Sequence, residues 1–140
     1  MRRFLALAVS TVALLGCPDG GNDSPTGPNT ASMAGTWILV SSGGSTLPVI
    51  LSESGGLTAE LTSDVRVFTT GGSFTVARTV RTTFEGQVTT SPANDAGTYT
   101  TSGSSVTLTY ASDGSTATGS VNGSVFTLTD HGVVLVFGKQ

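Results

Sequence analysis

The 140-residue chain is poor in charged residues, cysteine and histidine. Only 11% of its residues are charged, and it contains one Cys and one His. So few charges argue against a charged disordered tail, a coiled coil and a helical bundle, which need many Glu, Lys, Leu and Ala residues. A single cysteine excludes an intramolecular disulfide. One His and one Cys cannot supply the three or four ligands of a zinc site, so we expect neither a metal nor another cofactor.

Positive charge is especially scarce. The chain has six Lys and Arg residues against nine Asp and Glu residues. Arg2 and Arg3 lie in a segment that we expect to be removed, which leaves four basic and nine acidic side chains. No basic stripe remains that could release counterions from a phosphate backbone. We therefore expect no nucleic-acid partner.

The first 17 residues have the pattern of an export signal. Two arginines precede the mostly apolar run Phe4 to Leu15, which is shorter than the roughly 20 residues of a membrane-spanning helix. The run ends in Leu14-Leu15-Gly16-Cys17, which resembles the lipobox of bacterial lipoproteins. In such proteins the peptidase cuts before the cysteine, and the thiol is acylated. Residues 1–16 are thus a predicted lipoprotein signal peptide and Cys17 a predicted lipidation site; a plain secretory signal with an incidental cysteine is the alternative.

Residues 17–32 are predicted to form a flexible tether. The stretch after Cys17 contains three prolines and no apolar periodicity. Membrane lipid is the expected partner of the acylated Cys17, because acyl chains anchor a protein through their buried methylenes. Asp19 stands second after the cysteine, whereas the acidic retention signal of Gram-negative lipoproteins stands first. We therefore expect a lipid-anchored protein of the bacterial cell envelope, at the outer membrane.

Residues 33–140 have the pattern of an all-β domain. Runs of threonine and apolar residues are separated by clusters of Gly, Asn, Asp and Ser. Val106, Leu108 and Tyr110 alternate with threonines, which predicts a strand with one buried face and one solvent-exposed face. Asn122-Gly123 and Asp113-Gly114 suit tight hairpin turns. We expect strands near residues 35–41, 47–52, 57–62, 65–70, 73–84, 96–102, 105–111, 115–121, 124–129 and 132–138, where the pieces from 57 to 70 can also be one bent strand.

The expected architecture is an antiparallel up-and-down β-barrel of about eight strands. Closure into a barrel protects the sheet edges and buries one face. Alternation alone does not reveal whether the first and last strands pair, so a two-sheet β-sandwich is the alternative.

A resemblance to the lipocalin family supports the barrel. Gly35-Thr36-Trp37 is similar to the Gly-x-Trp motif with which lipocalins begin, and Gly97-Thr98-Tyr99 and Gly119-x-Val121-x-Gly123 follow in the order seen in lipocalin-like domains of small bacterial lipoproteins. The resemblance covers residues 33–140 and implies an antiparallel barrel. It also implies an Arg that follows the closing strand and packs over the tryptophan. This chain departs from that pattern with Lys139, whose ammonium could take the place of the Arg but lacks the planar guanidinium that stacks well on an indole. The domain is shorter than a classical lipocalin, and its nearest match to the family's Thr-Asp-Tyr element, Thr129-Asp130-His131, is better interpreted as a turn.

Catalytic motifs are missing from the sequence, and we expect no enzyme. His131 is the only imidazole, and no Gly-x-Ser-x-Gly elbow occurs. The scattered acids, including Asp64, are interpreted as solvated residues at strand ends. Arg78 and Arg81 are three apart along one strand and should face opposite sides, so an inward arginine could pair with an acidic ligand or a buried carboxylate.

The remaining candidate is a binding surface formed by the barrel interior and its opening. Residues 47–51 form one of the two longest apolar runs of the domain, which in a lipocalin-like arrangement leads from a lid into the second strand. The predicted ligand-binding residues are Trp37, Leu47, Val49, Leu51, Tyr99 and Tyr110. The expected function is that of an envelope lipoprotein whose barrel binds a small hydrophobic or amphipathic ligand. The alternative is a non-enzymatic structural or protein-interaction module with a filled barrel and an envelope protein as partner.

Overall fold

A computed structural model describes residues 32–140, which form ten antiparallel strands. The predicted signal peptide, Cys17 and the predicted tether up to residue 31 lie outside the described residues. The strands are β1 (Gly35–Ser42), β2 (Ser45–Thr46), β3 (Val49–Ser54), β4 (Leu57–Phe68), β5 (Ser73–Phe84), β6 (Gln87–Ser102), β7 (Ser105–Tyr110), β8 (Thr116–Asn122), β9 (Val125–Asp130) and β10 (Val133–Lys139). Within this part of the chain there is no helix long and apolar enough to cross a membrane.

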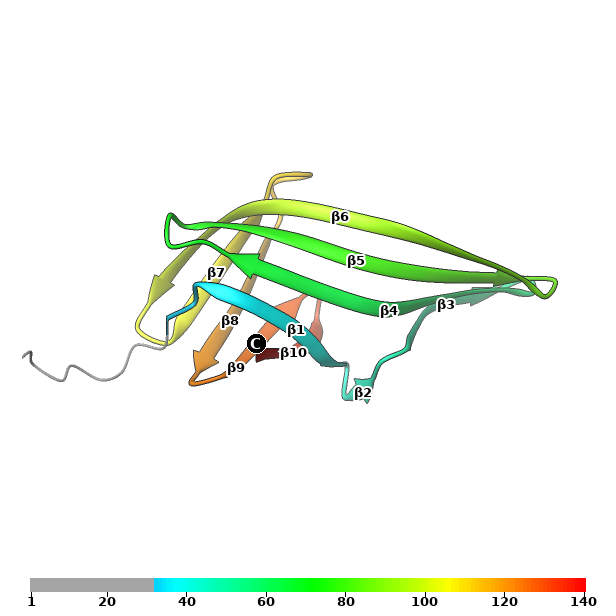
Figure 1. The fold of residues 1–140 in the computed structure, drawn as a ribbon, viewed down its shortest axis with the longest axis horizontal. Helices are drawn as coiled ribbons and strands as arrows, with labels where there is room; N and C mark the ends of the chain where they lie inside the picture. The colour runs from blue at the N-terminus through cyan, green and yellow to red at the C-terminus, as the bar shows by residue number, and fades with distance from the viewer. Residues whose placement is uncertain (1–31) are drawn as a thin grey trace, which may run out of the picture.

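Strand β1 closes the sheet into a barrel of eight strands (Figure 1). Each strand from β4 to β9 pairs with the strand that follows it in the chain. Strand β1 pairs with both β10 and β4 and so closes the ring. Trp37 accordingly lies opposite Lys139 on one side and Arg66 on the other. The predicted up-and-down barrel is confirmed, and the sandwich alternative is wrong because the first and last strands of the ring meet.

Four strands continue beyond the barrel as a projecting sheet, which we define as residues 49–61 and 80–94. Here β4 pairs with β3 instead of β1, and residues 87–94 of β6 pair only with β5. Figure 1 shows these long strands reaching away from the barrel, at the end opposite the start of β1. The projecting sheet therefore has two open edges, β3 and the first half of β6.

Strand β6 is much longer than the sequence indicates. It begins at Gln87, whereas the expected strand begins near residue 96. The additional segment, QVTTSPAND, is rich in residues typical of loops and contains Pro92. Cross-strand pairing with β5 makes it extended, and an edge strand tolerates a proline because one side of its backbone has no partner. The two pieces expected between 57 and 70 are one strand, β4 (Leu57–Phe68), with a bulge between Leu61 and Ser63.

The barrel interior is filled by side chains. Trp37, Leu108, Phe126, Leu128 and Phe137 are fully buried, and Phe126 stacks on Phe137 with ring centroids 5.5 Å apart. The Trp37 indole donates a hydrogen bond of 2.8 Å to the carbonyl oxygen of Met33. The ammonium of Lys139 lies 5.2 Å from the indole ring, as the resemblance implies for the residue at this place.

Two inward-facing glycines let neighbouring strands approach closely. A Cβ atom at Gly97 would collide with the carbonyl oxygen of Thr109, and one at Gly119 with the carbonyl oxygen of Thr127. Both obstacles are backbone atoms, so no side-chain rotation relieves them. The hairpin glycines predicted from the sequence also have the expected conformation, with φ of 58° at Gly123 and 71° at Gly114.

The substitution Gly119→Ala should lower the free energy of unfolding by about 1 to 3 kcal/mol, because the added methyl overpacks the backbone of β9. Gly138→Ala is the matched control, since a Cβ there meets only a Val40 methyl at 3.5 Å. We expect its effect to stay within about 0.5 kcal/mol. Urea unfolding of both variants measures the difference, and equal stabilities would contradict this account of the barrel wall.

Candidate binding site at the barrel mouth

The mouth is the end of the barrel from which the projecting sheet emerges, and it is hollowed. A hollow of about 320 Å³ lies at this end. It is lined by Ser42, Leu51, Leu61, Asp64, Arg78, Val80, Ala93, Asp130, His131, Val133 and Leu135. A hollow of about 450 Å³ on the outer face of β7, β8 and β9 is larger, but its lining is mostly serine and threonine, with Val106 and Gly119 and no charged side chain. Of these two hollows in the described part of the chain, the mouth is the one that combines apolar walls with converging charged groups, which is the usual composition of a small-molecule site.

A buried ion pair lies under the hollow. Arg66 is fully buried, and its Nε and Nη2 atoms donate to the two oxygens of Asp64 at 3.2 Å. These residues are two apart on β4, so both side chains face the barrel interior. The guanidinium also lies 4.7 Å from the ring centroid of Phe137. The arrangement satisfies a charge that would be very costly if it were buried alone.

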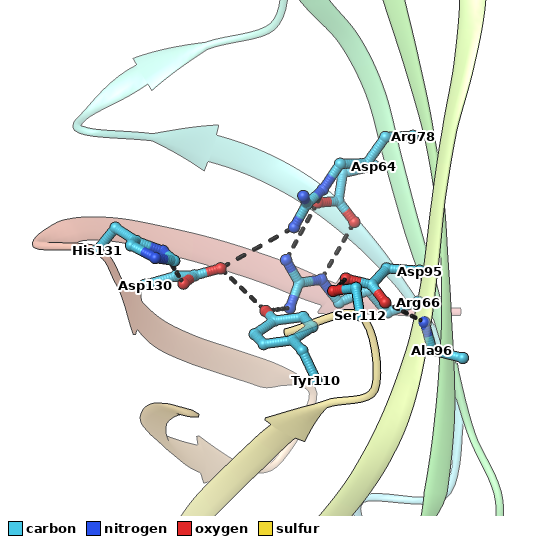
Figure 2. Close-up of polar contacts among 9 residues, drawn as sticks. All are labelled: Asp64, Arg66, Arg78, Asp95, Ala96, Tyr110, Ser112, Asp130 and His131. Atoms are coloured by element: carbon cyan, nitrogen blue, oxygen red, sulfur yellow. Dashed lines mark hydrogen bonds and ion pairs between the residues drawn. The ribbon is translucent and has the colours of Figure 1, made fainter. Parts of the chain in front are cut away.

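Tyr110, Asp130 and Arg78 complete a ring of polar contacts (Figure 2). Arg66 donates to the Tyr110 hydroxyl at 2.9 Å, and that hydroxyl donates to Asp130 at 2.9 Å. Arg78 donates from Nε to Asp64 at 2.9 Å, and its Nη2 lies 4.0 Å from Asp130. We call Asp64, Arg66, Arg78, Tyr110 and Asp130 the mouth ring. Its two positive and two negative charges balance.

Burial and pairing shift the pKa values of two groups of the mouth ring, Arg66 and Tyr110. Burial acts to lower the pKa of Arg66, but the charge and hydrogen bonds of Asp64, with a smaller contribution from Tyr110, raise the pKa above its usual value. The guanidinium therefore remains charged. Burial also raises the pKa of Tyr110, as does Asp130, while Arg66 opposes the shift. The hydroxyl therefore keeps its proton at neutral pH and can donate to Asp130.

The structure does not bring the six predicted ligand-binding residues together. Leu51 lines the hollow, and Tyr110 lies beneath it in the mouth ring. Trp37 is buried in the core, and Tyr99 packs edge-on against Phe68. Leu47 packs against the core, and Val49 is half-buried on β3.

The two arginines of β5 face opposite sides, as their spacing predicts. Arg78 faces the interior and pairs with the buried carboxylate of Asp64. Arg81 pairs with Glu60 through its Nη2 atom at 2.7 Å, and both side chains are partly exposed. The interpretation of Asp64 as a solvated strand-end residue is wrong, since only 1% of its side chain is exposed.

Sequence reasoning missed Arg66 and Asp130 as parts of a site. The only signal for Arg66 is its position in phase with Asp64 and Phe68, at a place where alternation puts the inward face. Nothing local to the sequence indicates that Asp130 reaches Tyr110, because these residues lie 20 positions apart.

His131 is exposed and contacts only the edge of the mouth ring. Its Nδ1 atom lies 2.8 Å from Asp130, and its backbone φ of 47° places it in the turn after β9. Within residues 32–140, its hydrogen bonds involve no hydroxyl that could act as a nucleophile. The described part of the chain also contains no group of three or more His, Cys, Asp or Glu side chains suited to holding a metal ion.

The substitution Asp64→Asn should lower the free energy of unfolding by about 3 to 5 kcal/mol, because it leaves the buried charge of Arg66 without its carboxylate. Glu60→Gln is the matched control on the same strand, since its partner Arg81 is 42% exposed. A partly solvated pair of this kind contributes about 1 kcal/mol or less. Chemical denaturation of the two variants measures this difference. Equal decreases in the free energy of unfolding for the two variants would show that burial of the Asp64–Arg66 pair does not determine how much the pair stabilises the fold.

Comparison of the chain with protein-family models, curated proteins and solved structures finds no match. The lipocalin-like resemblance therefore rests on the motifs of the sequence. The barrel itself is established by strand pairing.

Proposed function

We propose that the chain is a membrane-anchored lipoprotein of the bacterial cell envelope that binds a small hydrophobic or amphipathic ligand at the barrel mouth and performs no catalysis. The observation that carries the proposal is the hollow of about 320 Å³, which combines apolar walls with Arg78, Asp130 and His131. The basic start, apolar run and Leu-Leu-Gly-Cys quartet of residues 1–17 support the anchor. Outer-membrane attachment is part of the proposal.

The filled core favours the mouth over the lumen as the ligand site. Large side chains occupy the barrel centre, and the charge of Arg66 is already satisfied there by Asp64 and Tyr110. A ligand in the lumen would have to displace this packing. At the mouth, by contrast, a ligand would cover apolar surface that is still open to water, such as that of Leu51.

The second candidate function is that of a structural or protein-interaction module with an envelope protein as partner. The filled interior and the projecting sheet favour it. Both faces of that sheet carry apolar side chains that are at least one-third exposed, Leu57 and Phe84 on the inner face and Ile50 and Val88 on the outer face. Its two open edges, β3 and the first half of β6, can also pair with a strand of another protein.

Ligand binding at the mouth can be tested with a fluorescent fatty-acid probe sensitive to its environment. The protein is residues 17–140 with Cys17→Ser, so that no acyl chain of its own competes. We expect saturable fluorescence, and Leu51→Gln should weaken binding about 5- to 10-fold because it removes an apolar contact.

Ile50→Gln is the matched control for Leu51→Gln. The two neighbouring side chains are 57% and 54% exposed, but Ile50 is not among the residues that line the hollow. We expect Ile50→Gln to bind the probe as the unsubstituted protein does. An unsaturable signal, or equal weakening by both substitutions, would contradict binding at the mouth.

The anchor can be tested in cells supplied with labelled palmitate. Cys17→Ser should abolish incorporation of the label and leave an unprocessed precursor, because the serine hydroxyl does not replace the thiol that accepts the lipid. Pro18→Ala, which keeps the thiol, should remain labelled. Labelling of the Cys17→Ser protein would refute the lipidation site.

A further inference from the structure

We infer that the mouth selects a free single-chain amphiphile with an anionic head group, which binds Arg78 while the chain lies along the inner face of the projecting sheet. This inference rests on the proposed function and gives its ligand a chemical class. Carboxylate, phosphate and sulfate heads share the required chemistry, because each accepts the paired N–H donors of a guanidinium.

The donors and acceptors around the hollow are unequally satisfied. Both oxygens of Asp64 accept hydrogen bonds from arginines. Asp130 is engaged by the Tyr110 hydroxyl through one oxygen and by His131 through the other. A cationic head group would therefore meet carboxylates that already have partners.

Arg78, in contrast, uses only part of its hydrogen-bond donors within the described residues. A guanidinium carries five N–H donors, and among residues 32–140 the hydrogen bonds of Arg78 involve only Nε. Its Nη2 atom lies 4.0 Å from Asp130, which is beyond hydrogen-bond distance. The side chain is 30% exposed, whereas Arg66 below it is buried. Arg78 is thus the cation of the mouth ring that an incoming anion can reach.

A mostly apolar strip leads outward from Arg78 along the projecting sheet. Val80, Thr82 and Phe84 follow Arg78 on the same face of β5, where they lie opposite Leu61, Ala59 and Leu57 of β4, so that Thr82 is the one polar side chain of these six. At about 6.7 Å for every two residues, the strip from Arg78 to Phe84 is roughly 20 Å long. Leu57 and Phe84, at its far end, are more than one-third exposed.

The size of this face favours a single chain over a second copy of the protein. Five residues of each strand at about 3.4 Å, across four strands about 4.8 Å apart, give roughly 300 Å². A stable protein interface buries about 800 Å² on each partner. The face is therefore too small for a stable dimer through this sheet alone, while its narrow strip matches an extended alkyl chain.

The test compares ligands that share a chain but differ in head group. Calorimetric titration of residues 17–140 with Cys17→Ser uses dodecanoate, dodecyl phosphate, dodecanol and dodecyltrimethylammonium. The three charged amphiphiles are kept below their micelle concentrations and dodecanol below its solubility limit. We expect the two anions to bind about 10- to 100-fold more tightly than dodecanol, because charge-assisted hydrogen bonds to Arg78 distinguish them. The ammonium amphiphile should bind no more tightly than the alcohol.

Variants of the two β5 arginines identify the group responsible. Arg78→Gln should remove the preference for anions, so that dodecanoate and dodecanol bind with similar affinity, while Arg81→Gln, on the other face, should leave the preference intact. Arg78→Lys should retain a several-fold preference, because an ammonium keeps the charge but lacks the planar fork. Arg78→Lys also keeps a cation beside Asp64. If Arg78→Gln fails to fold, the anion preference of Arg78→Lys therefore tests whether the side chain at position 78 binds the head group.

Different results would contradict different claims. Equal binding of dodecanoate and dodecanol, or equal losses from Arg78→Gln and Arg81→Gln, would overturn the anionic class and leave the mouth site standing. Failure of all four amphiphiles to bind would contradict the proposed function itself. Arg78-dependent sedimentation with phosphatidylglycerol vesicles would identify a membrane surface instead of a free single-chain ligand, and would also overturn the inference.

Discussion

The positive charge of Arg66 at the centre of the barrel constrains the arrangement of the whole mouth. An unpaired charge at this depth would cost several kcal/mol. Asp64 meets it from the same strand, Tyr110 from β7, and the face of Phe137 from β10. Asp64 in turn accepts from Arg78, and Tyr110 donates to Asp130. One buried charge therefore joins five strands, β4, β5, β7, β9 and β10, and orients the groups that line the hollow.

The filled core changes where a ligand can bind in this barrel. Eight strands enclose a space just wide enough to be filled by side chains or to hold one small ligand. Here Trp37, Phe126 and Phe137 take up that space, and the inward glycines Gly97 and Gly119 bring strands closer together. The open surface that remains lies where the longest strands leave the ring. Binding energy there comes from covering exposed side chains, and the packing of the interior stays intact.

Much of the fold follows from local patterns, whereas the site depends on distant partners. Alternation in Val106, Leu108 and Tyr110 predicts the inward face of β7, and the turn glycines predict the hairpins. Because a spacing of three positions reverses the face on a strand, Arg78 and Arg81 are also correctly assigned to opposite sides. The first half of β6 is not predictable in this way, since its extended shape depends on pairing with β5. Asp64 is misinterpreted for a similar reason: two arginines, one of them on another strand, make its burial possible.

Strand β1 separates the two ends of the molecule. It begins at Gly35, close to where Lys139 donates to the carbonyl oxygen of Ser32, and ends at Ser42 in the wall of the hollow. Any attachment made through the preceding residues thus acts at the pole away from the opening. A protein anchored through those residues would therefore present its hollow and projecting sheet on the side that faces away from the anchor.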